Sequence, residues 1–202
     1  MARPLTILMD EHRLIENVLG SLETCAIEIE GGLALERGFA RDYAAFLRGF
    51  ADAWHHGKEE DILFRRMTER GFSAESGPVA VMLHEHREGR ALVGAIHGVG
   101  EGTGDVTPAE RAAFLAGAQG FIPLLRQHIQ KEDNILYPMS ERVLTLAEFE
   151  TMLTDFAAFE AKAGADGTRD RLETLAVQLA RSFRPDEGRM AAGSAGGCWP
   201  RG

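Results

Sequence analysis

The chain has 202 residues, with 22 Lys and Arg against 31 Asp and Glu, and this gives a formal net charge of −9. The length suits one domain with its own hydrophobic core, and the charge argues against binding to nucleic acid or to an anionic membrane, because both reward clustered Lys and Arg. No apolar run approaches the roughly 20 residues of a membrane-spanning helix, and the first residues lack a signal-peptide pattern, so we expect a cytoplasmic protein that does not bind membranes.

Helix-forming residues dominate the sequence, and no stretch shows the alternating pattern of a half-buried strand. Breaks containing glycine or proline divide the chain into helical segments. Four long helices are expected, over about residues 4–30, 35–70, 78–99 and 109–138. These segments and their short connections predict an all-α fold, an up-down four-helix bundle.

Two shorter helices, over about residues 146–163 and 169–183, are expected to follow the bundle. The last segment, residues 185–202, is rich in Gly, Ala and Arg, and we expect it to be a disordered tail. The predicted domain therefore covers residues 1–184, with the core bundle over residues 4–140.

On each of the four long helices, apolar residues recur at steps of three and four, which predicts that this face packs against the bundle interior. Each of these apolar faces includes one histidine, and the four are His12, His55, His86 and His128. On the fourth helix we expect the buried face to continue through Ile135 and Met139.

The sequence around His55 recurs around His128. The ten residues from His55 to Phe64 align with those from His128 to Tyr137 at an offset of 73. A Glu-His-Arg triplet precedes each copy, with its histidine 43 residues before the first copy and 42 residues before the second. Each half of the repeat therefore holds one histidine and one His-x-x-x-Glu pair, whose two side chains lie on the same helical face.

Four imidazoles and two carboxylates on apolar faces are a ligand set for two metal ions. Each buried glutamate would cost several kcal/mol if nothing compensated its charge. A single histidine on such a face is more often a hydrogen-bonded core residue, but the matched spacing of all six residues favours metal binding. The candidate metal ligands are His12, His55, Glu59, His86, His128 and Glu132.

Iron is the metal that this ligand set fits best. Imidazole suits zinc, iron, copper and nickel, and bridging carboxylates suit paired ions of higher coordination number. Two structural zinc ions would remain underfilled with six ligands, and magnesium or calcium would need more oxygen. We expect an oxo- or hydroxo-bridged centre of two non-haem iron ions, bridged by Glu59 and Glu132, with two histidines on each iron.

Three further histidines do not fit the repeat. His84 lies two residues before His86, so it is expected on the exposed face. His97 is too far along its helix to reach the same ions, and we expect it in the core or at a bundle end. His56 is rotated by about 100° from its neighbour in an α-helix, so we expect it no closer than behind the metal ligands.

Several polar residues flank the candidate ligands. Glu60 and Asp133 each follow a ligand glutamate, and they are candidates either for hydrogen bonds to the ligands or for exposed charge. Lys58 and Lys131 match each other in the repeat and are expected to point outward. Tyr137 could border the site, but a plain packing role is the expected one.

The paired half-sites resemble those of the hemerythrin-like (HHE cation-binding) family. The resemblance rests on His12 with His55-x-x-x-Glu59 and on His86 with His128-x-x-x-Glu132, and it covers about residues 4 to 140. The sequence from His55 to Phe64 is also similar to the corresponding motif of the family. The resemblance implies a left-handed four-helix bundle with a non-haem di-iron centre, held by the six residues one for one.

Two departures from the oxygen-carrying hemerythrins bear on function. Those proteins have a further histidine on the third helix, where this sequence has Met82, and a carboxylate five residues after the fourth-helix histidine, whereas Glu132 follows His128 by four. The resemblance therefore implies a near-symmetric site, open at both irons, as in the non-carrier bacterial branch. That branch includes di-iron proteins tied to nitrosative stress and iron–sulfur repair, typically with a cysteine-bearing N-terminal domain that this sequence does not show.

The favoured function is a cytoplasmic di-iron protein that binds or turns over O2, NO or peroxide in oxidative or nitrosative stress. The alternatives are an oxygen or iron sensor or iron-binding protein without catalysis, and a protein that assists iron–sulfur cluster repair. The sequence predicts a small diatomic ligand or peroxide as the partner and no nucleic acid. It leaves open the redox donor, any protein partner, and whether the protein is an enzyme.

Overall fold

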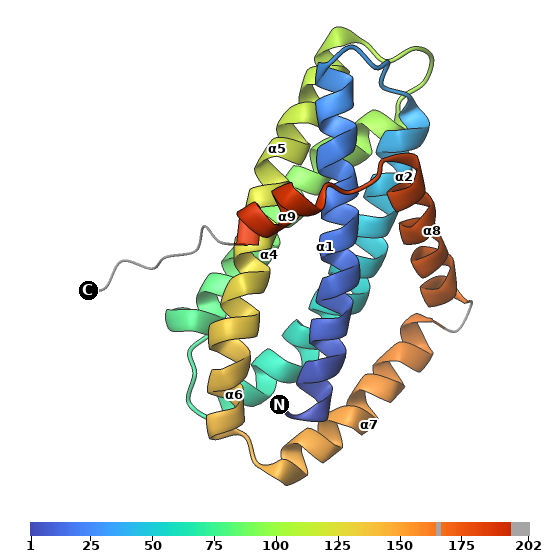
Figure 1. Cartoon of the computed structure of the whole chain (residues 1–202). Coiled ribbons are helices and arrows are strands. Elements are labelled where there is room, and N and C mark those ends of the chain that lie inside the picture. The colour runs from blue at the N-terminus through green and yellow to red at the C-terminus, as the bar shows by residue number, and fades with distance from the viewer. Residues whose placement is uncertain (165–166, 195–202) are drawn as a thin grey trace.

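The computed structural model describes residues 1–164 and 167–194, and within them it contains helices and no strand. Four long helical stretches run up and down in turn and form a bundle (Figure 1). The first and third are single helices, α1 (Arg3–Glu30) and α4 (Gly77–Glu101). The second consists of α2 (Arg37–Phe46), η1 (Leu47–His56), η2 (Glu59–Phe64) and α3 (Arg65–Glu69). The fourth consists of α5 (Pro108–Lys131), η3 (Glu132–Leu136) and α6 (Tyr137–Val143). The predicted all-α bundle is confirmed.

Residues typical of helix N-termini occur where these helices begin. Pro4 and Pro108 lie in the first turns of α1 and α5, where a missing N–H leaves no hydrogen bond unmade. At the start of α5, the Thr107 hydroxyl accepts from the Glu110 amide at 3.2 Å, and the Thr107 amide donates to the Glu110 carboxylate at 2.8 Å. This capping box satisfies two amides that the helix itself cannot pair.

Three segments, η1, η2 and η3, are π-helical, and two of them begin at the candidate ligands Glu59 and Glu132. A π-turn bonds residue i to i+5 and so holds one more residue than an α-turn. Within η3 the buried face is consequently one residue later than an α-helix would place it. Ile135 is 40% exposed, whereas Leu136 is 1% exposed, so the prediction that Ile135 is buried is wrong.

The chain continues into helices that lie outside the four-helix bundle: α7 (Leu146–Ala163), α8 (Thr168–Ser182) and α9 (Glu187–Ser194). α7 lies across one end of the bundle, and α8 packs beside α1 and α2 (Figure 1). The helix α9 contacts α1 and α5, so the expectation of disorder does not hold for residues 187–194. The rest of the predicted tail, residues 195–202, lies outside the described residues.

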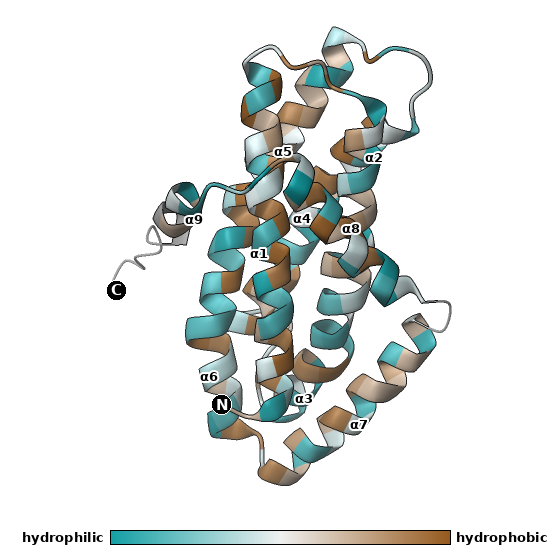
Figure 2. Cartoon of the chain, turned by 45° about the vertical axis from the view of Figure 1, so that its right-hand side comes forward, coloured by the Kyte–Doolittle hydropathy of each residue, from teal (hydrophilic) through white to brown (hydrophobic). Residues whose placement is uncertain are grey.

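The hydrophobic core consists of two clusters, separated by a layer of histidines and glutamates. Along α1, Leu5 and Leu8 belong to one cluster, Ile15 begins the other, and His12 lies between them. The same interruption falls at His86 on α4. Figure 2 shows apolar and polar residues alternating along the helices, as one-sided burial requires. The polar layer therefore lies inside the bundle, with apolar side chains above and below it. None of the described helices has the length and apolar character needed to span a membrane.

Candidate metal centre

The six predicted metal ligands converge inside the bundle, and each is at most 1% exposed. Their ligand atoms fall into two overlapping groups, each with all its atoms within 4.8 Å of one another. The first group contains His12, His55, Glu59 and Glu132, and the second contains His56, Glu59, His86 and His128. His12 and His55 thus face one position, and His56, His86 and His128 face a second.

The closest pair of imidazole nitrogens has the spacing of two ligands to one ion. His86 Nε2 and His128 Nε2 are 3.0 Å apart. Two nitrogens bound at right angles to one metal, each at a distance of about 2.1 Å, would be separated by about 3 Å. The two rings are tilted by 57°, with centroids 4.7 Å apart, so they are not stacked and their planes can meet at one ion.

The two glutamates connect the two positions. Glu132 Oε2 is 3.3 Å from His12 Nε2 and 3.2 Å from His128 Nε2. Glu59 Oε2 is 3.6 Å from His55 Nε2 and 3.6 Å from His86 Nε2. Each carboxylate therefore lies between one histidine of the first group and one of the second, which is the placement of a ligand that bridges two ions.

Several buried polar atoms at this centre have no hydrogen-bond partner among the described residues. They are the Nε2 atoms of His55 and His56, Oε2 of Glu59, and both carboxylate oxygens of Glu132. An unpaired buried polar atom costs about 1–3 kcal/mol, and more when it is charged. A pair of metal ions would take up these atoms as ligands, so the donor set fits a di-iron centre.

A ring of four carboxylates holds the outer nitrogens of the ligand histidines. Each carboxylate is adjacent in sequence to one ligand and contacts the histidine of another helix. The Nδ1–carboxylate distances are 3.0 Å for His55–Glu11, 2.6 Å for His86–Glu60, 2.9 Å for His128–Glu85 and 2.7 Å for His12–Asp133. Such contacts leave Nε2 as the free ligand nitrogen and fix the ring orientation. The ring passes from α1 to η1, from η2 to α4, from α4 to α5, and from η3 back to α1.

The sequence repeat extends to the lysines that contact this ring. Lys58 contacts Glu11, and its repeat counterpart Lys131 contacts Glu85. The expectation that both lysines point outward is wrong, because each reaches the carboxylate that orients a ligand histidine. The side chain of Lys58 is 0% exposed, whereas that of Lys131 is 20% exposed.

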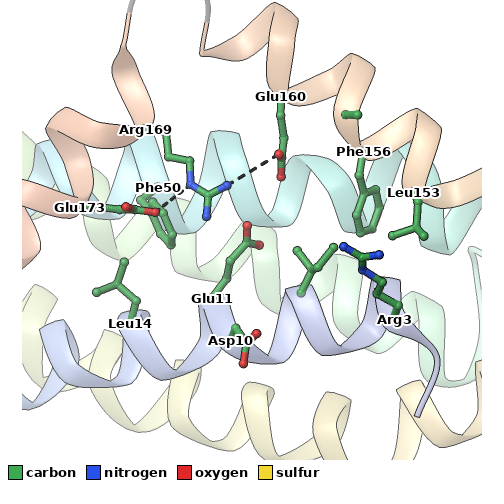
Figure 3. A pocket seen from close by; sticks show the side chains of 12 residues that line it. Arg3, Asp10, Glu11, Leu14, Phe50, Leu153, Phe156, Glu160, Arg169 and Glu173 are labelled. Atoms are coloured by element: carbon green, nitrogen blue, oxygen red, sulfur yellow. Dashed lines mark hydrogen bonds and ion pairs between the residues drawn. The ribbon is translucent and has the colours of Figure 1, made fainter.

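The added C-terminal helices reach the first half-site through Lys58. The Lys58 ammonium also donates to Glu160 of α7 at 2.7 Å. Figure 3 shows Glu11 and Glu160 projecting toward each other across a cavity of about 450 Å³ between α1, α7 and α8. Arg169 of α8 also lines this cavity and pairs with Glu160 and Glu173. No equivalent cover is seen over Lys131, so the two half-sites differ in their surroundings within the described residues.

The two bridging glutamates have opposite pKa shifts in the metal-free protein. Burial raises the pKa of Glu59 well above its usual value, and the nearby charge of Glu132 raises it further. Burial would also raise the pKa of Glu132, but His128 and His12 hold it well below the usual value. Burial would lower the pKa of His128, yet Glu132 and Glu85 raise it to about 9. In the metal-free centre a proton is therefore held more readily by Glu59 than by Glu132, whose carboxylate lies 3.2 Å from His128 Nε2.

These shifts predict opposite pH dependences for folding and for metal binding. A raised histidine pKa stabilises the fold fully below the unfolded value of about 6.5, and that stabilisation is lost as pH rises through about 9. The contribution of His128 to the stability of the metal-free protein should therefore fall by up to about 3 kcal/mol on going from pH 6.5 to 9. Metal binding should release protons and tighten over the same range, because the ligand atoms must be deprotonated.

The measurement is a set of denaturant unfolding curves of the metal-free chain between pH 6.5 and 9. Proton release on metal addition is measured at pH 7 by calorimetry in two buffers of different ionisation enthalpy. The His128→Gln variant is the control, and its stability should vary much less with pH. A metal-free stability that rises over this range would contradict the assignment of charge to His128.

The remaining predictions for this region have mixed outcomes. His84 is exposed, as expected, and His97 is half-buried beside a second cavity. Tyr137 is buried among apolar side chains, but its hydroxyl also donates to Glu59 Oε1 at 2.6 Å, so it does more than pack. His56 belongs to a ligand group instead of lying behind it.

Two residues of the carboxylate ring, Glu11 and Glu85, were not assigned a role from the sequence. The repeated Glu-His-Arg triplets contain both of them, so the signal was present. Glu60 and Asp133 were candidates for hydrogen bonds to the ligands, and the structure places them in such contacts.

Known proteins provide an independent comparison. A family model described as hemerythrin HHE cation binding domain matches residues 3–140. The iron–sulfur cluster repair proteins YtfE of Yersinia pseudotuberculosis serotype IB and of Yersinia pestis strain Pestoides F are each 35% identical to this chain over 145 residues. The match covers 69% of this chain and 58% of each relative, so the chain matches little more than half of their length. No solved structure matches the chain significantly.

The matched segment contains the bundle and both ligand groups, and it ends before α7. The fold, the repeat and the buried donor set agree with this match. The chain belongs to the hemerythrin HHE cation-binding family.

Proposed function

We propose that the chain is a non-haem di-iron protein that binds or turns over O2, NO or peroxide in the response to oxidative or nitrosative stress. The observation that supports this most strongly is the pair of ligand groups that share Glu59, with Glu132 Oε2 placed between His12 of one group and His128 of the other. His12 and His55 would hold one iron, His86 and His128 the other, and both glutamates would bridge them. Each iron then has about four protein ligands, which leaves room for a small exogenous ligand.

The bound ions would supply the affinity for a diatomic ligand or peroxide and the electrons for its reduction. The protein fixes the ligand atoms before metal arrives. Tyr137 donates to Glu59 Oε1 at 2.6 Å, which leaves Oε2 facing the imidazoles of His55 and His86. Preorganised groups of this kind need no reorganisation when the metal changes charge.

The apolar clusters on either side exclude water from the centre. On one side lie Phe50 and Phe121, and on the other lie Phe64 and Leu136, all at most 3% exposed. A dry surrounding strengthens the electrostatic interactions inside it. Small uncharged molecules such as O2 and NO enter such an environment with less desolvation than charged substrates do.

Iron–sulfur cluster repair is the second candidate, and the names of the relatives favour it. In that function the chain would release iron to a damaged cluster instead of retaining it. Because the chain spans 58% of those relatives, their activity is carried over only as a hypothesis.

The test begins with anaerobic reconstitution by ferrous iron, desalting, and iron determination per chain. About two irons per chain are expected from the ligand set. The loaded protein is then mixed with NO, O2 or peroxide in the presence of a reductant. Turnover well above that of free iron would support an enzyme. Stoichiometric oxidation alone would instead leave a binding or sensing protein, and iron content near zero would overturn the di-iron proposal.

The repair hypothesis needs a different readout. The iron-loaded chain is incubated with an apo iron–sulfur protein, sulfide and a chelator that traps free iron. Cluster formation despite the chelator would support direct iron transfer. Retention of all iron by the chain, with turnover of NO or peroxide, would favour the first function.

A further inference from the structure

Each carboxylate of the ring that orients the ligand histidines is itself paired with a basic side chain. The four pairs are Glu11 with Lys58, Asp133 with Arg13, Glu60 with Arg90, and Glu85 with Lys131. The side chain of Lys58 is 0% exposed, whereas those of the three other basic partners are between 20% and 52% exposed. Solvent and salt screen an exposed pair far more than a buried one. The contact of Lys58 is therefore the one that acts most strongly on its carboxylate.

The helix α7 buries Lys58 and supplies its second partner. The Lys58 ammonium donates to Glu160 of α7 at 2.7 Å and also contacts Glu11 of α1. Phe156 of α7 lies on another side, with its ring centroid 5.4 Å from the ammonium. Lys58 is thus held between a helix of the bundle and a helix outside it.

Glu11 connects Lys58 to a ligand histidine through its two oxygens. Oε1 accepts from Lys58 and from Trp54 Nε1, the latter at 3.1 Å, and Oε2 lies 3.0 Å from His55 Nδ1. Two donors on Oε1 restrict the direction of Oε2, and a carboxylate on Nδ1 sets the ring orientation and basicity of a metal-binding histidine. A continuous chain of contacts therefore runs from Glu160 through Lys58 and Glu11 to His55.

The second half of the sequence repeat lacks this connection. Lys131, the counterpart of Lys58, contacts Glu85, and among the described residues no second carboxylate lies within ion-pair distance of it. The family model matches residues 3–140, and α7 begins only at Leu146. The connection therefore depends on a helix outside the matched segment.

Other ion pairs also hold α7 to the bundle but do not lead to the metal centre. Asp155 pairs with Arg66, and Glu148 pairs with Arg70. Beside Glu160, a cavity of about 450 Å³ lies between α1, α7 and α8 (Figure 3). A helix that borders such a space has fewer packing contacts to lose when it opens locally. Undocking of α7 is thus a motion that could be linked to the centre through Glu160.

We propose that Glu160 is a positioning residue for the metal position at His12 and His55, and that docking of α7 and filling of that position stabilise each other. This inference rests on the proposed di-iron function. Docked α7 holds Lys58 on Glu11, so that His55 keeps the orientation in which it binds metal. Undocking removes one carboxylate and the cover from Lys58, and His55 is then held less firmly.

The coupling is reciprocal, because a docking step that tightens iron binding by some factor is itself tightened by iron by the same factor. Loss of a partner behind a metal ligand typically weakens metal binding 10–100-fold. Glu160 acts on His55 through two other side chains, so we expect the lower end of this range, about 10-fold.

The test is hydrogen–deuterium exchange of the full chain, resolved to peptides of α7, without metal and after anaerobic loading with ferrous iron. In the wild type, iron should slow the exchange of α7 by about 10-fold. In Glu160→Gln, iron should still bind but should no longer slow this exchange. Competition with a ferrous chelator should show that one of the two irons binds about 10-fold more weakly in this variant.

The matched control is Asp155→Asn, which removes a different ion pair between α7 and the bundle. Its α7 peptides should exchange faster than those of the wild type both with and without iron. Iron should still slow that exchange by the wild-type factor, and both irons should bind with wild-type affinity. Circular dichroism and thermal melts establish that both variants are folded.

The outcomes separate this inference from the proposed function. A wild-type chain that binds no iron defeats the di-iron proposal and, with it, the role of Glu160. Iron that binds without changing the exchange of α7 overturns the inference alone, and so does a Glu160→Gln variant that responds to iron as the wild type does. Loss of the response in Asp155→Asn as well would also overturn it, because weakened docking of α7 would then be the cause.

Discussion

The Glu132→Gln variant is expected to bind at most about one iron per chain, where the wild type binds about two. Glu132 Oε2 faces His12 of one group and His128 of the other, so the substitution weakens both metal positions together. The amide keeps the size of the carboxylate but removes its charge, which is the main attraction for a cation in a buried site. Iron per chain after anaerobic loading and desalting is the measurement.

Two companion variants make this result specific. His84→Ala removes an exposed imidazole of the same protein and should keep the full iron content. Glu59→Gln should lose iron as Glu132→Gln does, because Glu59 Oε2 faces His55 and His86. Equal iron content in all three variants would show that the ions, if bound, lie elsewhere.

A Lys58→Met variant is expected to be less stable than the wild type by about 3–5 kcal/mol, because it leaves one partner of a buried ion pair without the other. The Lys58 ammonium lies between Glu11 and Glu160, and it is 5.4 Å from the ring centroids of both Trp54 and Phe156. Methionine replaces the aliphatic stem, so the loss reports mainly on the charge. The thermal midpoint should fall by roughly 10 °C.

The repeat provides a matched control for this variant. Lys131→Met removes the counterpart lysine, but the pair of Lys131 with Glu85 is partly exposed, at 20% and 13%. Such a pair is worth about 1 kcal/mol or less, so the loss should be several-fold smaller. Equal losses in both variants would show that burial and the contact with α7 do not distinguish the two lysines.

Much of the fold followed from the spacing of apolar residues. Steps of three and four marked one face on each long helix, and the histidines on those faces are buried where the spacing placed them. The candidate ligands could be recognised because the sequence repeats the His-x-x-x-Glu pair. A repeat of this kind needs no knowledge of how the helices pack.

The errors on Ile135 and His56 fall in the π-helical turns. A periodicity of 3.6 residues assumes an α-helix throughout, whereas η1 and η3 hold more residues per turn and rotate less per residue. In η3 this moved Ile135 to the surface. In η1, His55 and His56 are both buried and each belongs to a ligand group, although the prediction for an α-helix placed His56 behind the ligands.

The carboxylate ring and the buried lysine could not be derived from local patterns. Glu11 contacts His55 across 44 positions of sequence, and Asp133 contacts His12 across 121. Such pairs depend on how two helices face each other, which spacing within one helix does not specify. Lys58 is buried because α7 covers it, and that helix follows only after the bundle is complete.

The carboxylate ring has a consequence for the alignment of the helices. Apolar faces alone would tolerate a shift of one helix by a full turn, about 5.4 Å, because apolar groups would still meet apolar groups. A shift of that size would separate each Nδ1 atom from its carboxylate by more than the span of a hydrogen bond. Each of the four long helical stretches supplies one carboxylate and one histidine to these contacts. The ring therefore fixes the axial position of each helix relative to its neighbours. The metal pocket forms only when all four helices have these positions.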